Sequence, residues 1–450
     1  MAAINRRQFL KASGVGAAAA FAACPGAAFA QGIGTSAPFD DYKALVCVFL
    51  FGGNDSFNLL VPRSNAEYNV YAASRQNLAI PQADLLPITP ATPDGAQYGL
   101  HPSMSGLKRL FDENRVALVS NLGPLIEPTT RDQYFNQSVA LPPQLFSHND
   151  QQDQWHSLKG TGVSKTGWAG RIGDMIQLNV ANQLMATNAS LFGSSLFQSA
   201  DDSIAYVMGP GGPITFDGFG DTSPFIEQRQ AFENIIGANY ASIYERGFAE
   251  VQQRAVAAAD LVSDAIANAP VRNTVFPASQ LGQQLQTISR LIDVRADLQM
   301  ERQIFFVAAG GFDSHDDQNQ NQPGLLGGIA DAITAFYDAT VEMGVSDSVT
   351  TFTQSDFGRT LSSNGDGTDH AWGGNQFVVG GAVRGDMYGT YPLLQIGGND
   401  DVGGGRMIPT TSADQYAATL ARWFGIPDVD LDAVAPNIGN FIDRDLGFFV

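Results

Sequence analysis

Residues 44–51 read ALVCVFLF and run directly into the turn Gly52-Gly53-Asn54-Asp55-Ser56. A continuous run of apolar, β-branched and aromatic residues of this length predicts a strand that is buried on both faces. The glycine pair permits a tight turn after the strand. The segment therefore predicts the first strand of a parallel sheet, with the acidic side chain of Asp55 at its carboxyl end.

Two later segments repeat this arrangement. QIFFVAA (303–309) leads into Gly310-Gly311-Phe312-Asp313-Ser314-His315, and VTTFTQ (349–354) leads into Ser355-Asp356-Phe357-Gly358-Arg359. Ligands of open α/β sheets bind outside the carboxyl ends of the strands. Three turns that carry acidic residues to that edge therefore predict a site there.

Further apolar runs predict strands at 116–120 and 377–383, and helical patterns lie at 248–267, 278–302, 325–343 and 413–424. Strands that alternate with helices indicate an α/β fold of three layers, a largely parallel sheet with helices on both faces. We expect one domain over residues 31–450. Residues 192–223, which are rich in Gly, Ser and Phe, are interpreted as an insertion or flap within it.

The first 30 residues have the layout of an export signal. Arg6-Arg7-Gln-Phe-Leu-Lys precedes a weakly apolar run that ends in Ala28-Phe29-Ala30, a typical cleavage site. The paired arginines resemble the twin-arginine signal of bacteria. We expect cleavage after Ala30, with the twin-arginine export machinery as a partner and a periplasmic or secreted protein as the product. Lipid attachment at Cys24 is a minor alternative, and the apolar run is too short for a stable membrane span.

The charge of the chain limits its partners. The formal net charge is −20, and the predicted signal carries no acidic residue, so its removal leaves a more negative chain. Such a surface repels nucleic acid. A small anionic substrate remains compatible with it, because a bound divalent metal can invert the local potential.

All five histidines lie near carboxylates, amides or turn glycines, and none lies in an apolar run. This placement predicts polar or functional roles rather than positions in the core. Asp313 with His315, and Asp369 with His370, each combine a hard oxygen and a borderline nitrogen ligand. Such pairs suit a divalent metal. Plain ion pairs within the fold are the alternative.

These motifs together resemble the DUF1501 family of exported bacterial proteins. The matching motifs are the twin-arginine signal, Gly52-Gly53-Asn54-Asp55, Gly310-Gly311-Phe312-Asp313-Ser314-His315, Phe357-Gly358-Arg359 and Gly367-Thr368-Asp369-His370, together with Leu100-His101-Pro102 and Ser147-His148. The family is similar in turn to the alkaline phosphatase and sulfatase superfamily. That resemblance implies an alkaline-phosphatase-like fold and one or two divalent metals, with zinc or manganese expected.

The resemblance also implies the ligand set, namely Asp55, Asp313, His315, Asp369 and His370. The spacing Asp-x-His is shorter than the superfamily phosphatases have, and no histidine follows His370. His148 or His101 could replace the missing ligand, or a single metal could bind. A formylglycine sulfatase is disfavoured, because no Cys-x-Pro-x-Arg motif occurs.

Ser147 is the leading candidate nucleophile. An acid follows it three residues later, which predicts a helix N-terminus whose backbone N–H groups favour an oxyanion. His148, Gln152 and His156 would then share one helix face. The alternatives are that Ser147 is an ordinary N-cap and His156 a surface residue, with Ser56 as the competing nucleophile.

Arg359 is the candidate anion clamp, and Arg171 is a second. Each could instead hold a carboxylate of the fold.

The sequence thus predicts an exported metal-dependent hydrolase that acts on a small phosphate or sulfate ester. In the predicted reaction the metal polarises the ester and activates Ser147 or water. The alternative is an exported binding or assembly protein in which the superfamily site has become non-catalytic. The missing late histidine favours that alternative.

Overall fold

A computed structural model describes residues 39–450, apart from 92–93 and 215–221. The predicted signal, its cleavage site and Cys24 lie outside the described residues.

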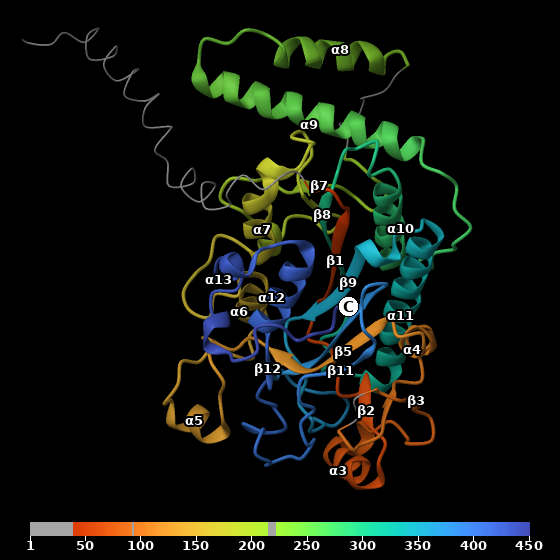
Figure 1. Cartoon of the computed structure of the whole chain (residues 1–450), viewed down its shortest axis with the longest axis vertical. Coiled ribbons are helices and arrows are strands. Elements are labelled where there is room, and N and C mark those ends of the chain that lie inside the picture. Colours follow the sequence, from red (N-terminus) through yellow and green to blue (C-terminus); the bar gives the residue numbers. More distant parts are fainter. Residues whose placement is uncertain (1–38, 92–93, 215–221) are drawn as a thin grey trace, which may run out of the picture.

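A nine-stranded sheet forms the centre of the molecule, in the order β11-β5-β10-β9-β1-β8-β6-β7, with β12 beside β5 (Figure 1). Its strands are β1 (Lys43–Leu50), β5 (Val116–Gly123), β6 (Asn188–Ser190), β7 (Tyr206–Val207), β8 (Arg302–Ala309), β9 (Val349–Ser355), β10 (Gly374–Gly380), β11 (Asp386–Tyr388) and β12 (Thr411–Ser412). Strands β2 (Leu60–Pro62), β3 (Leu86–Ile88) and β4 (Tyr98–Leu100) form a separate small sheet.

The large sheet is mostly parallel, as predicted. Strand β1 pairs in parallel with β8 on one side and with β9 on the other. Strand β10 is the exception, because it runs antiparallel to both β5 and β9. The strand predicted at 377–383 begins earlier than expected, at Gly374, and ends at Gly380.

Hydrophobic cores lie on both faces of the sheet. Successive residues of β1 alternate between them: Val46 and Val48 belong to one core, and Cys47 and Phe49 to the other. Helices α4, α10 and α11 lie on the first side, and α6, α7, α12 and α13 on the second (Figure 1). The helices are α3 (Asn65–Arg75), α4 (Ser105–Asp112), α5 (Arg131–Asn136), α6 (His148–Ser157), α7 (Trp168–Ile176), α8 (Phe225–Ile236), α9 (Ile243–Ala267), α10 (Gln280–Asp293), α11 (Gln318–Glu342), α12 (Ala413–Phe424) and α13 (Leu431–Val434).

The predicted helix boundaries hold in part. Helix α12 has the predicted bounds, and α9 begins five residues before the predicted start. The helix predicted at 278–302 is wrong at its C-terminal end, because α10 ends at Asp293 and Arg302 already belongs to strand β8. Helix α11 begins at Gln318, well before residue 325, and contains Pro323 in its second turn.

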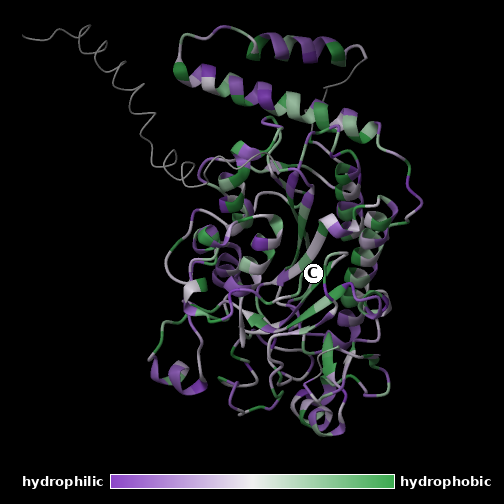
Figure 2. Ribbon diagram, in the orientation of Figure 1, coloured by the Kyte–Doolittle hydropathy of each residue, from purple (hydrophilic) through white to green (hydrophobic). Residues whose placement is uncertain are grey.

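The segment predicted as an insertion contributes to the sheet. Tyr206 and Val207 form β7, which pairs with β6 at the edge of the sheet. Residues 215–221 of the same segment lie outside the described residues. Helices α8 and α9 follow and lie across one end of the molecule (Figure 1), where both carry hydrophilic and hydrophobic residues (Figure 2). Among the residues that the structure describes, no helix is long and apolar enough to cross a membrane.

The position of His156 shows that two expectations from the sequence were wrong. One was that the histidines avoid the core, and the other was that His156 lies on the surface. Its side chain is buried, with its ring 4.7 Å from that of Phe49 and 5.8 Å from that of Phe306. The apolar neighbours come from β1 and β8, far from His156 in the sequence, so the local sequence did not show them. Burial lowers the pKa of His156 to about 3.

We expect His156 to make the protein less stable in acid. Between pH 6.5 and about 3 the unfolded chain binds a proton at His156 that the folded chain does not. The free energy of unfolding should therefore fall as the pH falls through this range, by at most about 1.4 kcal/mol per pH unit for this one group. His156→Phe should lower the slope of the unfolding free energy against pH by up to about 1.4 kcal/mol per pH unit, the contribution of one proton. Urea unfolding between pH 4.5 and 7 measures this slope. An unchanged slope would contradict the pKa shift.

Candidate metal centre

The three turns predicted from the sequence meet at one edge of the sheet. Gly52 allows the first and second turns to lie close together, because a Cβ atom added to Gly52 would lie only 2.3 Å from the backbone nitrogen of Asp313. Its φ of 115° also favours glycine. The third turn joins them through Asp356, whose Oδ2 accepts a hydrogen bond from the Gly52 backbone N–H at 3.2 Å.

Asp369 and His370 also lie at this edge of the sheet, on a backbone segment beside the third turn. The backbone N–H of Thr360 donates to the Asp369 carbonyl at 2.9 Å, and that of Thr368 donates to the Ser314 carbonyl at 2.9 Å. Backbone pairing thus places the pair Asp369 and His370 against the turn that carries Asp313.

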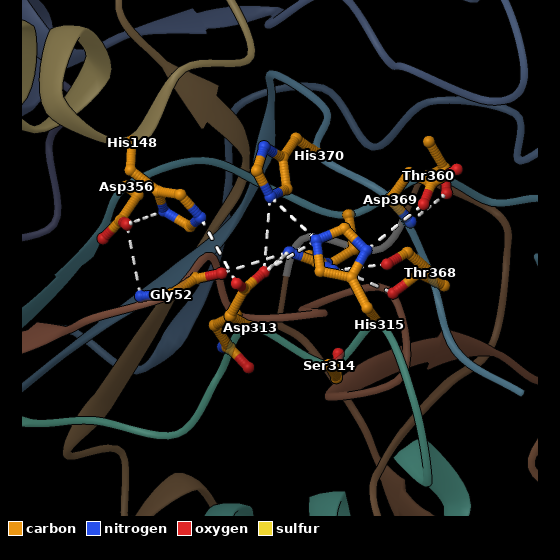
Figure 3. Close-up of polar contacts among 12 residues, drawn as sticks. Gly52, His148, Asp313, Ser314, His315, Asp356, Thr360, Thr368, Asp369 and His370 are labelled. Atoms are coloured by element: carbon orange, nitrogen blue, oxygen red, sulfur yellow. Dashed lines mark hydrogen bonds and ion pairs between the residues drawn. The ribbon is translucent and has the colours of Figure 1, made fainter.

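Three histidines face Asp313 (Figure 3). His148 Nε2 lies 3.5 Å from Asp313 Oδ2, and His370 Nε2 lies 3.3 Å from Asp313 Oδ1. His315 Nε2 lies 3.1 Å from Asp313 Oδ1 and 3.0 Å from His370 Nε2. The ligand atoms of His148, Asp313 and His370 all lie within 4.8 Å of one another.

The second nitrogen of each ring has an oxygen acceptor. His148 Nδ1 lies 2.6 Å from Asp356 Oδ2, His370 Nδ1 lies 2.8 Å from the Phe146 carbonyl, and His315 Nδ1 lies 3.3 Å from Asp369 Oδ1. In the neutral form of each ring, these acceptors favour the tautomer with the proton on Nδ1, which leaves the lone pair of Nε2 available to a metal. Histidines that bind metals are held in this way.

The donor set fits a small divalent cation. Tetrahedral zinc with Zn–N bonds of about 2.05 Å places its ligand atoms roughly 3.3 Å apart, close to the separations around Asp313. His315 Nε2 and His370 Nε2 lie 3.0 Å apart, so one of them donates to the other when its Nε2 carries a proton, and a bound cation would take the place of that proton. Burial lowers the pKa of His370 more than the hydrogen bond to the Phe146 carbonyl raises it, so its net shift is downward. Burial raises the pKa of Asp313, but the hydrogen bond and charge of Arg359 lower it more, so its net shift is downward.

Asp55 lies behind this group rather than among its contacts. The Asp55 carboxylate Oδ2 accepts short contacts from Arg75 and from Gln318. Thr368 Oγ1 donates to Gln318 Oε1 at 2.7 Å, and Arg359 Nε donates to Thr368 Oγ1 at 3.2 Å. This chain connects Asp55 to the site. Its role as a metal ligand stays a prediction.

Ser147 is the N-cap residue of α6, as predicted, but the capping hydrogen bond is absent. Its hydroxyl instead donates to Asp150 Oδ2 at 2.6 Å. The competitor Ser56 is buried, and its Oγ accepts a 2.6 Å hydrogen bond from the Asn375 backbone N–H. His148 and Gln152 share a helix face as predicted, since both contact Asp356 Oδ2.

Both predicted arginine clamps are engaged within the fold. Arg359 is fully buried and donates to Asp313 Oδ1 at 2.8 Å and to the Gly52 carbonyl at 3.2 Å. Arg171 donates to four backbone carbonyls, those of Ser157, Thr166, Ala433 and Val434. The alternative interpretation, in which Arg359 holds a carboxylate of the fold, describes its observed contacts. His101 is buried, and its Nδ1 accepts from the Ser103 backbone N–H, which orders that loop.

Sequence reasoning missed two groups that orient histidines. Asp356 was placed at the sheet edge but was given no role, although an acid at the end of a third strand was a usable signal. The Phe146 carbonyl had no signal in the sequence, because its direction depends on a left-handed backbone with φ of 71°.

The fold and the site define an α/β protein with a candidate His/Asp metal centre at the carboxyl ends of parallel strands. Residues 42–426 match the family model described as "Protein of unknown function (DUF1501)", so the chain belongs to the DUF1501 family. Residues 3–23 match the twin-arginine translocation signal, which confirms a periplasmic or secreted protein exported by that pathway. No curated protein matches the chain.

Distant solved structures are similar to the chain. Ps i-CgsB in complex with k-i-k-neocarrahexaose has a TM-score of 0.37 at 10% identity, over 90% of this chain and 77% of that one. Ps i-CgsB without that ligand has a TM-score of 0.35 at 10% identity, with the same coverage. A structure from work on glycosaminoglycan metabolism by Bacteroides thetaiotaomicron has a TM-score of 0.32 at 10% identity, over 87% of this chain and 74% of that one.

Proposed function

We propose that this protein is an exported metal-dependent hydrolase of phosphate or sulfate esters with an alkaline-phosphatase-like arrangement. The observation that carries the proposal is the orientation of His148, His315 and His370. Each ring has its Nδ1 held by an oxygen acceptor and its Nε2 directed at Asp313. The three histidines come from different segments of the chain, so the geometry of a single turn cannot account for their common orientation.

His148, Asp313 and His370 would hold the cation, and His315 would add a fourth donor. A bound zinc or manganese ion would supply Lewis acidity toward an ester oxygen. Asp356 orients His148 and keeps its proton on Nδ1, while the Phe146 carbonyl does the same for His370. The buried Arg359 fixes the Asp313 carboxylate by a 2.8 Å contact.

Ser147 remains our candidate nucleophile. It directly precedes the proposed ligand His148, and its hydroxyl donates a 2.6 Å hydrogen bond to the carboxylate of Asp150. An oriented water molecule is the alternative nucleophile. The same hydrogen bond also favours a second candidate function, an exported binding or assembly protein, because it engages the Ser147 hydroxyl within its own helix.

We expect zinc- or manganese-loaded protein to hydrolyse an activated aryl phosphate or aryl sulfate, and chelation to abolish that turnover. Ser147→Ala should lower kcat by at least roughly 100-fold, the scale of activated nucleophiles and general bases. Its stability should change little, because the side chain makes no capping hydrogen bond. The measurements are steady-state kinetics, metal content and urea unfolding.

The exposed Ser138, changed to alanine, is the matched control and should behave like the parent protein. Full turnover in Ser147→Ala would assign the nucleophile to water. A protein that holds stoichiometric metal and cleaves neither class of ester would support the binding function instead.

A further inference from the structure

A guanidinium with free N–H donors is well suited to hold a phosphate or sulfate ester beside a metal. The buried arginines at this edge of the sheet do not offer such a group. Arg359 is committed to Asp313 and to backbone oxygens, and Arg75 is committed to Asp55, Asn58 and the Thr360 carbonyl. A cation that holds the oxyanion would therefore lie on the exposed surface around the site.

Arg406 contacts the backbone of His370, one of the residues of the candidate metal centre. Its Nε donates to the carbonyl of His370 at 3.0 Å, and its Nη1 donates to the Gly403 carbonyl at 2.9 Å. The guanidinium carbon lies 5.3 Å from the centre of the Phe146 ring. Phe146 is the residue whose carbonyl holds His370 Nδ1. Arg406 is thus fixed against both His370 and the group that orients it.

The free donors of Arg406 distinguish it from the buried arginines. Its side chain is partly exposed, and it forms no ion pair with any residue that the structure describes. Two of its five N–H groups are used, which leaves both N–H groups of Nη2 and one of Nη1 for a ligand. Adjacent N–H groups of a guanidinium match two oxygens of a phosphate or sulfate.

We propose that Arg406 binds the tetrahedral oxyanion of the substrate beside the metal centre, the role that the sequence suggested for Arg359. This inference rests on the proposed function. The contacts with His370 and Phe146 hold the guanidinium in place before the substrate arrives, so little side-chain freedom is lost on binding. The Phe146 ring also favours the cation electrostatically.

The test uses full-length mature protein loaded with zinc and inorganic phosphate as the probe. Arg406→Gln should raise the Kd for phosphate in calorimetry on the order of 10- to 100-fold, the range for a hydrogen bond to a charged group. KM for an aryl phosphate should rise by a similar factor, with a smaller change in kcat. Zinc content should be unchanged. Arg406→Lys restores the charge but not the paired N–H groups, so it should recover only part of the affinity.

The exposed Arg384, changed to glutamine, is the matched control and should leave both constants unchanged. Parent-like phosphate affinity and KM in Arg406→Gln, with an active parent protein, would overturn this inference and leave the proposed function in place. A zinc-loaded parent protein that neither binds phosphate nor cleaves an ester would overturn both. Loss of zinc from Arg406→Gln and Arg406→Lys alike would instead show that Arg406 only supports His370, and would also overturn the inference.

Discussion

Replacing His370 with alanine should lower the affinity of the protein for zinc by more than roughly 100-fold. Loss of a group that merely orients a ligand costs about 10- to 100-fold, and His370 is proposed as a ligand itself. Its Nε2 lies 3.3 Å from Asp313 Oδ1 and 3.0 Å from His315 Nε2, so its removal takes away a donor that both neighbours face. Competition titration with a chromophoric chelator measures the change.

Two variants make this result specific. Asp356→Asn removes the charge that holds His148 Nδ1 at 2.6 Å and should weaken zinc binding by about 10- to 100-fold. His156→Phe removes a histidine of the same helix as His148 that lies in the core, and should leave zinc affinity unchanged. Equal zinc affinity in His370→Ala and the parent protein would show that the histidines form ion pairs of the fold and no metal centre.

The strands were predictable because burial leaves a strong local signal. Four of the five predicted strands, β1, β5, β8 and β9, begin within one residue of the predicted start, because these segments are rich in apolar, β-branched or aromatic residues; β5 continues three residues beyond the predicted end. The register and the antiparallel direction of β10 depend on long-range pairing, which no local pattern encodes. The end of α10 was missed for a related reason. Residues after Asp293 keep a helical composition, but the chain must turn there for Arg302 to enter β8.

The site was predictable in its residue types but not in all of its roles. Asp313, His315, Asp369 and His370 were identified from motifs, and the structure joins them by direct contacts. The engagement of Arg359 was left open, because the sequence cannot show that the Gly52 carbonyl and Asp313 surround its guanidinium. Arg406 lies in a glycine-rich loop with no recognisable motif. Its relevance depends on a backbone carbonyl, that of His370.

Replacing Arg75 with methionine should destabilise the protein by about 3–5 kcal/mol. Arg75 and Asp55 form a fully buried ion pair, with 0% and 1% of their side chains exposed. Removing one partner of such a pair leaves the other as an uncompensated buried charge, which is the costly step. The partly exposed Arg422, which pairs with the exposed Asp428 and Asp445, provides the control, and Arg422→Met should cost less than about 1 kcal/mol for each pair lost. Urea unfolding at pH 7 measures both changes.

The same pair can decide the role of Asp55. If Asp55 only balances Arg75, then Asp55→Asn in the Arg75→Met background should recover part of the lost stability, because the double variant contains neither buried charge. Its zinc affinity should then equal that of the parent protein. If Asp55 is a metal ligand, Asp55→Asn should lower zinc affinity as strongly as His370→Ala does. The contacts of Oδ2 with Arg75 and Gln318 favour the first result, although Oδ1 of Asp55 is buried with no hydrogen-bond partner among the described residues. A large loss of zinc would instead return Asp55 to the ligand set that the first strand turn suggested.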